Sequence, residues 1–143
     1  MKNKIITLIL LVTLSVFANA FAKDSAKEFS DAGMEFAKQS KYTEAIISYA
    51  RAIELNSNFT EAYYGRGLAY GRKGELDKAI ADFTTVMTLD PGFAAVYNDR
   101  AVTYCSKKEY DKAWADVHKA EELGYKVNPD FLIDLKKASG REK

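Results

Sequence analysis

Hydrophobic and small side chains recur three or four positions apart along most of the chain, with polar and charged residues between them. In residues 61–73, and again in residues 76–89, this spacing places them on one face of a helix. Gly74 separates the two segments, and a Pro-Gly turn at residues 90–92 ends the second one. The pattern predicts a pair of helices here, and no stretch shows the alternation that is typical of a β-strand.

This helix pair is one of three units that align at a spacing of 34 residues, over about residues 26–59, 60–93 and 94–127. Small residues fill two of the aligned columns: Gly33, Gly67 and Ala101 in one, and Ala45, Ala79 and Ala113 in the other. A constant period of this length is typical of stacked repeats, in which each unit buries its apolar face against its neighbours. We expect the small columns to let paired helices approach closely.

The residues after the third unit predict a further short helix. Asn128 and Pro129 have the character of an N-cap and a first helical residue. Phe131, Leu132 and Leu135 give the following residues one apolar side, which would cover the open end of the stack. The sequence therefore predicts an all-α solenoid over residues 23–139: three helix-turn-helix repeats and a C-terminal capping helix at about 129–138, followed by a tail at 140–143.

Residues 1–22 have the pattern of a secretory signal peptide. Two lysines precede an uncharged, mostly apolar stretch, which ends in two small-x-small sites. Cleavage is expected after Ala20 or Ala22, and nothing in the sequence decides between them. A retained membrane anchor is the alternative, because the uncharged stretch over residues 5–22 is at the lower limit for a spanning helix. We therefore expect an exported protein, in a bacterial periplasm or secreted, with no membrane span once the leader is removed.

The composition argues against several classes of function. The chain has 143 residues, of which 48% are hydrophobic and 29% charged, and its formal net charge is +1. These values suit a folded domain and provide no basic face for nucleic acid. His118 is the single histidine, and the sequence has no P-loop, no nucleophile elbow and no zinc-binding motif. We therefore expect no catalysis, metal or cofactor. Cys105 is the single cysteine, either a small packing residue or a free thiol.

The aligned columns resemble the tetratricopeptide repeat (TPR) family, whose signature runs from an aromatic residue through Leu-Gly, Tyr, Ala, Phe and Ala to Pro. The second unit matches best, at Tyr63, Gly67, Tyr70, Gly74, Ala79, Phe83 and Pro91. The leucine position of the signature departs from it, since it holds Ala32, Arg66 and Arg100. The position of Gly74 is occupied by Ser40 and Lys108 in the other units, so those turns are expected to differ.

The resemblance implies a concave groove, lined by the first helix of each unit, in which extended or helical peptide segments dock. The groove residues that it implies here are Ser30, Met34, Lys38, Tyr64, Leu68, Arg72, Asn98 and Val102. Met34, Leu68 and Val102 would form an apolar stripe, Tyr64 an aromatic anchor, and Asn98 a partner for a peptide backbone. Gly65 and Gly71 have no evident packing role, and we expect both to leave the groove floor bare. The alternative is that these apolar residues only pack against neighbouring helices.

The sequence can be checked for the residues with which the family binds one known class of ligand. Some TPR domains bind acidic chaperone C-termini with a clamp of Lys, Asn and Arg. The matching positions here hold Ser30, Met34, Gly65, Ala95 and Asp99, none of which fits. We therefore predict a non-catalytic adaptor or scaffold that binds another protein or peptide in its groove. The alternatives are a self-assembling module of an envelope complex and, least favoured, a small enzyme. The sequence leaves the oligomeric state open.

Overall fold

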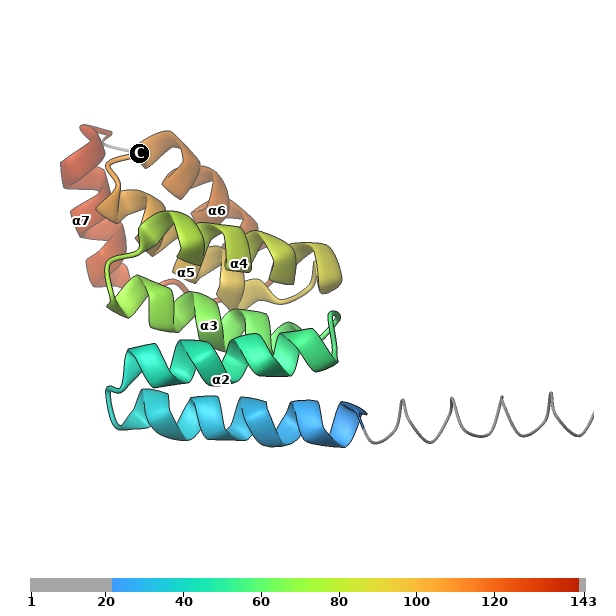
Figure 1. Cartoon of the computed structure of the whole chain (residues 1–143). Helices are drawn as coiled ribbons and strands as arrows, with labels where there is room; N and C mark the ends of the chain where they lie inside the picture. The colour runs from blue at the N-terminus through green and yellow to red at the C-terminus, as the bar shows by residue number, and fades with distance from the viewer. Residues whose placement is uncertain (1–21, 142–143) are drawn as a thin grey trace, which may run out of the picture.

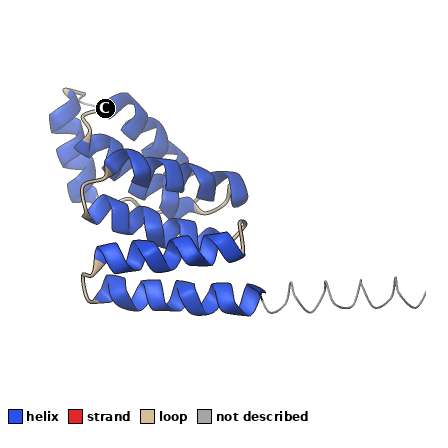
Figure 2. Cartoon of the chain, in the orientation of Figure 1, coloured by secondary structure: helices blue, strands red, loops and turns tan. Residues whose placement is uncertain are grey.

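The structure is a computed structural model that describes residues 22–141. The predicted leader, apart from residue 22, lies outside the described residues. The first helix is described from residue 22 to 38, so residues 23–27 belong to it. The other helices are α2 (Tyr42–Leu55), α3 (Thr60–Arg72), α4 (Leu76–Leu89), α5 (Ala94–Ser106), α6 (Tyr110–Glu122) and α7 (Pro129–Ser139). Figure 2 shows these helices and their connecting turns, and residues 22–141 contain no strand.

The helices stack in chain order, from the first helix at one end to α7 at the other (Figure 1). α3 packs against both α2 and α4, α5 packs against both α4 and α6, and α7 lies against α6. Each helix therefore buries its apolar face against its neighbours along the chain, as stacked repeats must. The predicted fold class, an α-solenoid of three helix-turn-helix repeats with a C-terminal capping helix, is confirmed. Among residues 22–141, no helix has the length and apolar character needed to cross a bilayer.

The small columns lie where the helices come closest. Ala45, Ala79 and Ala113 are fully buried. A Cβ atom added to Gly67 would lie 2.7 Å from the ring of Phe83, which is closer than carbon atoms can pack. The ring therefore fills the space that the missing side chain leaves between α3 and α4. This agrees with the expectation that the small columns allow close approach of paired helices.

The capping helix begins as the sequence predicts. Asn128 Oδ1 accepts a hydrogen bond of 2.8 Å from the backbone N–H of Asp130, and Pro129 is the first helical residue. Leu135 is fully buried in a cluster with Trp114 and other residues of the third unit. The cap therefore covers apolar surface that the last repeat would otherwise expose.

The turn between the two helices of each unit has one geometry throughout. Gly74, Ser40 and Lys108 all have positive φ, at 78°, 58° and 63°. In each turn two backbone N–H groups bond back to the end of the preceding helix; in the second unit, that of Glu75 reaches the carbonyl of Tyr70 at 3.0 Å. The expectation that the Ser40 and Lys108 turns would differ is wrong, because the helix end needs a left-handed residue whether or not it is glycine.

Replacing Lys108 by glycine is expected to stabilise the chain by about 0.5 kcal/mol. A side chain at positive φ costs about 1–2 kcal/mol, which is partly offset by the extra freedom of glycine in the unfolded chain. The side chain of Lys108 is exposed, so its removal loses no packing. Gly74→Ala is the opposite change in the equivalent turn and should destabilise by about 1 kcal/mol. Urea unfolding measures both; a destabilising Lys108→Gly would contradict the left-handed turn.

The two arginines that depart from the repeat signature form ion pairs inside their own units. The Nε and Nη2 atoms of Arg66 donate to the two carboxylate oxygens of Asp82, both at 2.8 Å. Arg100 makes the same pair of bonds, again at 2.8 Å, to Asp116. Each aspartate is only 5% exposed. These bidentate pairs join the two helices of the second unit and the two helices of the third unit.

Candidate functional site

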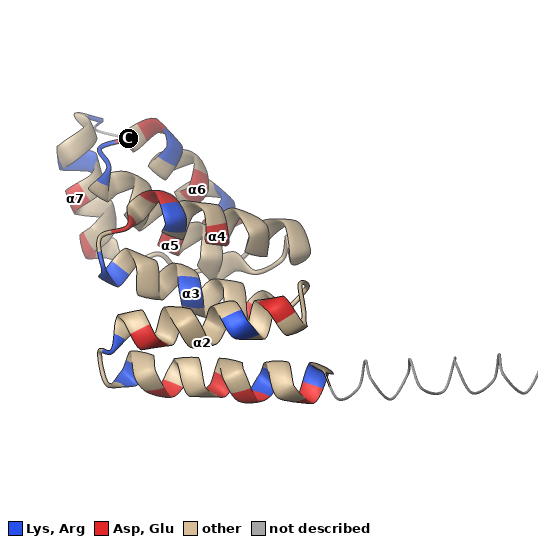
Figure 3. Ribbon diagram, in the orientation of Figure 1, with Lys and Arg blue, Asp and Glu red and all other residues tan. Residues whose placement is uncertain are grey.

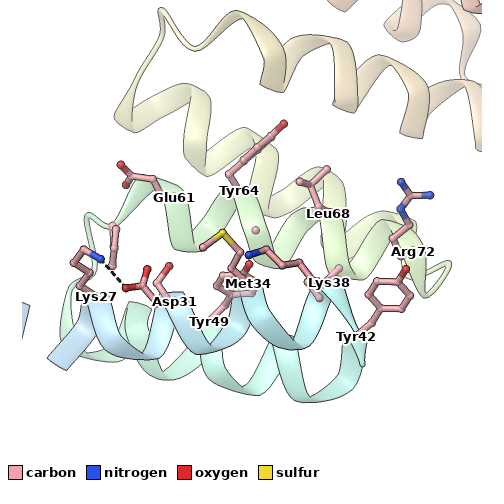
Figure 4. A pocket seen from close by; sticks show the side chains of 15 residues that line it. Lys27, Asp31, Met34, Lys38, Tyr42, Tyr49, Glu61, Tyr64, Leu68 and Arg72 are labelled. Atoms are coloured by element: carbon pink, nitrogen blue, oxygen red, sulfur yellow. Dashed lines mark hydrogen bonds and ion pairs between the residues drawn. The ribbon is translucent and has the colours of Figure 1, made fainter. Parts of the chain in front are cut away.

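A pocket of about 890 Å³ lies between the first helix and α3. Figure 4 shows the side chains of these two helices facing each other across it, with Tyr42 and Tyr49 contributed by α2. Its volume is within the range of about 300–1,000 Å³ that is usual for ligand sites. The first two repeats therefore form the walls of a concave site.

Six of the eight predicted groove residues line this pocket: Ser30, Met34, Lys38, Tyr64, Leu68 and Arg72. Asn98 and Val102 do not line it. Val102 is exposed on α5, and the side-chain amide of Asn98 donates to Asp99 at 3.3 Å. The pocket thus brings together the predicted residues of the first two units and leaves out those of the third. That these eight residues contact a partner stays a prediction.

Two large apolar side chains remain exposed inside the pocket. Met34 on the first helix is 47% exposed, and Leu68 on α3 is 40% exposed. They occupy equivalent positions of consecutive repeats and face the same space (Figure 4). An apolar side chain placed between them would remove apolar surface of both residues from water, which favours binding.

Tyr64 contributes its ring to the pocket, but its hydroxyl is already engaged. The ring lies 4.8 Å from that of Phe93, centroid to centroid, and 6.1 Å from that of Phe83. The hydroxyl donates to Asp99 at 2.5 Å, and burial together with this bond raises the pKa of Tyr64. Burial also raises the pKa of Asp99, against the opposing effects of its hydrogen bonds from Tyr64 and Asn98 and of the charge of Arg72. Tyr64 therefore ties α3 to α5 beside the pocket.

The floor of the pocket depends on two glycines. A Cβ atom on Gly65 would lie 2.4 Å from the ring of Tyr49, and one on Gly33 would lie 2.9 Å from the same ring. The ring of Tyr49 therefore fits between the first helix and α3 only because both positions lack a side chain. The expectation that Gly65 has no packing role is wrong. A Cβ atom on Gly71, in contrast, would meet no atom within 4 Å.

The charges at the two ends of the pocket differ. At one end Lys27 Nζ lies 2.6 Å from Asp31 Oδ2, and Glu61 lies across from this pair (Figure 4). At the other end are Lys38 and Arg72. Lys38 Nζ is 3.7 Å from an exposed neighbouring glutamate, a weak contact, and Arg72 forms no ion pair with another described residue. One end is therefore cationic, although charges of both signs are interspersed over the whole molecule (Figure 3).

Outside the pocket, the side chains that could be reactive form no cluster in the part of the chain that the structure describes. Residues 22–141 contain no group of three or more His, Cys, Asp or Glu side chains placed to hold a metal ion. The His118 ring lies 5.8 Å from that of Trp114, centroid to centroid. Cys105 packs against the buried cluster that contains Trp114 and Leu135, and burial raises the pKa of its thiol. This contact favours the packing role for Cys105.

Comparison with known proteins identifies the repeat. The family profile described as "Tetratricopeptide repeat" matches residues 60–93, and a second profile, "TPR repeat", matches residues 33–74. No curated protein matches the chain in sequence.

Solved structures resemble most of the described chain. The first TPR domain of Spaghetti (RPAP3), bound to the HSP90 peptide SRMEEVD, superposes with a TM-score of 0.75 at 23% identity, over 82% of this chain and 93% of that one. MamA matches with a TM-score of 0.69 at 33% identity, over 70% of this chain and 58% of its own. YrrB, described as a TPR protein with an unusual peptide-binding site, matches with a TM-score of 0.67 at 31% identity, over 79% of this chain and 56% of its own. The chain thus spans little more than half of MamA and of YrrB. Residues 33–93 are tetratricopeptide repeats, and the described part of the chain folds as a TPR solenoid.

Proposed function

We propose that the chain is a non-catalytic module that binds a peptide segment of a partner protein in the pocket between the first helix and α3. One observation carries the proposal: Met34 and Leu68 remain exposed on facing walls of a concave space of about 890 Å³. Two similar structures support this class of ligand, because YrrB has a peptide-binding site and the Spaghetti domain holds a bound peptide.

The affinity of such a site would come mainly from apolar burial. Fully burying a Met or Leu side chain is worth about 1.5–3 kcal/mol, and both residues here are a little under half exposed. The remaining exposed surface of the pair therefore offers roughly 1 kcal/mol each, with more from the partner's own side chain. Peptide binding of modest strength is the expected result, because ordering a flexible segment costs part of this gain.

Leu68→Glu is expected to abolish peptide capture by the full-length chain. The change places a charge in the apolar centre of the pocket, where a bound apolar side chain would have to desolvate it. Dodecapeptides displayed on phage and selected on the wild-type chain provide the probe, and their retention on the variant is the measurement. Because Leu68 is partly exposed, the variant should keep its helical circular dichroism.

Ile47→Glu is the matched control for this experiment. Ile47 is 65% exposed on α2 and does not line the pocket, so the same type of change should leave peptide capture intact. Equal capture by wild type, Leu68→Glu and Ile47→Glu would remove the pocket as the binding site.

The compartment is a separate part of the proposal. The signal-peptide pattern of residues 1–22 supports an adaptor or scaffold that acts after export, in a bacterial periplasm or outside the cell. The mass of the protein recovered from its native source tests this: a mature chain that begins at residue 21 or 23 is expected. A chain of full mass in the cytoplasmic fraction would overturn it.

A further inference from the structure

We infer that the pocket selects an extended segment that carries a large apolar side chain and, two residues further on, an aspartate or glutamate side chain. The inference rests on the peptide-binding function proposed above and adds the chemistry and direction of the bound segment. It follows from three features of the pocket: the spacing of its side chains, the distribution of its charges and the hydroxyl groups on its floor.

The apolar pair and the cationic pair of the pocket are one helical turn apart. Lys38 follows Met34 by four residues on the first helix, and Arg72 follows Leu68 by four residues on α3. Four residues advance about 6 Å along a helix. Side chains on one side of an extended chain, at positions i and i+2, are separated by about 6.6 Å. An extended segment therefore places one side chain between Met34 and Leu68 and the next one between Lys38 and Arg72.

The charges favour a carboxylate at the second of these positions. The third cation in the pocket, Lys27, already pairs with Asp31, since its Nζ lies 2.6 Å from a carboxylate oxygen of that residue. The negative charge of Glu61 therefore remains at this end of the pocket. Arg72 holds no ion pair with another described residue, although its charge acts to lower the pKa of Asp99 on α5, and Lys38 has only its 3.7 Å contact. An acidic side chain is thus attracted to the Lys38–Arg72 end and repelled from the Glu61 end, which sets the direction of the bound segment.

Cations at the last turn of a helix also stabilise that helix, so Lys38 and Arg72 have a role without any ligand. That role does not account for the two apolar side chains exposed one turn before them. Only the combination, an apolar pair and a cationic pair in register on two helices, has the form of a binding site for two consecutive side chains of one segment.

The floor of the pocket favours an extended segment over a helical one. Ser30, only 8% exposed, and Tyr49 both line the pocket, and neither hydroxyl bonds another described residue or is sealed from solvent. An extended segment has backbone N–H and C=O groups without internal partners, and these two hydroxyls can bond them. The backbone of a helix is satisfied internally and would leave both hydroxyls unused.

The test is a selection of random dodecapeptides displayed on phage, carried out in parallel on three full-length chains. These are the wild type, the charge-reversed double variant Lys38→Glu/Arg72→Glu, and Lys126→Glu/Lys137→Glu. The third has the same net charge as the second but changes exposed residues outside the pocket. Wild type and the control should both enrich a large apolar residue followed two positions later by Asp or Glu. The charge-reversed variant should enrich Lys or Arg at that second position instead.

The strongest selected peptide then gives the magnitude. Its Glu→Gln counterpart should bind wild type about tenfold more weakly by fluorescence anisotropy, and added salt should narrow the difference. Peptides that are captured, and lost on Leu68→Glu, but that show no acidic preference would overturn this inference and leave the proposed function standing. An acidic residue enriched four positions after the apolar one would replace the extended segment by a helical one and so also overturn it.

Two further outcomes separate this inference from the function on which it rests. Failure of every chain to retain peptides above the Leu68→Glu background would remove the proposed function and the inference together. Self-association of the wild type in sedimentation, lost in the charge-reversed variant and kept in the control, would assign the pocket to a second copy of this chain. That result would overturn the partner segment proposed here.

Discussion

Ala79→Arg should destabilise the chain by about 3–5 kcal/mol, because it forces a long, charged side chain into fully packed space. Ala79 is fully buried in a cluster with Phe83, Val86 and Val96. The buried carboxylate three residues further along α4, that of Asp82, already accepts both of its strong bonds from Arg66. The introduced guanidinium would therefore be buried without a partner.

Ala81→Arg provides the matched control in the same helix. Ala81 is exposed, so the identical substitution there should change the free energy of unfolding by no more than about 0.5 kcal/mol. Urea unfolding followed by circular dichroism gives both values. A small effect at Ala79 and a large one at Ala81 would mean that the buried face of α4 has been assigned to the wrong side.

This pair of variants depends on a feature that the sequence alone revealed: the helical phase of each unit. A small residue at the same position of every repeat indicates that two helices pack closely there. Three aligned copies then show which side of each helix is buried. For this reason the order of helices and the buried alanine column were predictable, whereas the capping helix was predictable from Asn128, Pro129 and the apolar residues after them. The family resemblance placed Met34, Leu68, Lys38 and Arg72 in one groove, and the structure shows them lining a pocket.

Other features depended on contacts between helices, which a repeat pattern does not describe. The role of Gly65 follows from the path of the Tyr49 ring between the first helix and α3. The Tyr64 hydroxyl is engaged by Asp99, 35 residues away, in the next repeat. Nothing in the spacing of either residue indicates its partner. The pocket also stops short of the third unit, a limit that the repeat spacing does not indicate.

The arginine pairs are an intermediate case, since the sequence contained a signal that column-by-column comparison missed. Arg66 and Arg100 are each followed 16 residues later by an aspartate, whereas the first unit has Ala32 and Ser48 at these two positions. Arginine and aspartate therefore occur together or not at all. Two columns that change together indicate a contact between their residues, here the bidentate ion pair that joins the helices of one unit.

The ion pairs lead to the second large effect. Arg100→Ala is expected to destabilise the chain by about 3 kcal/mol, because it leaves the carboxylate of Asp116, only 5% exposed, without its partner. Asp116→Ser should cost less, about 1–2 kcal/mol, since the guanidinium can retain its bond of 2.9 Å to Thr84 and its position over the ring of Tyr104.

The double variant Arg100→Ala/Asp116→Ser completes the cycle and copies the residues of the first unit. It removes both charges, so no unpaired charge is buried, and its cost should fall about 2 kcal/mol below the sum of the two single changes. Urea unfolding of the four chains measures this coupling. Strictly additive effects would show that the pair contributes no more than two independent side chains. A coupling of the expected size would show that each charge of the pair is tolerated at its buried position only in the presence of the other.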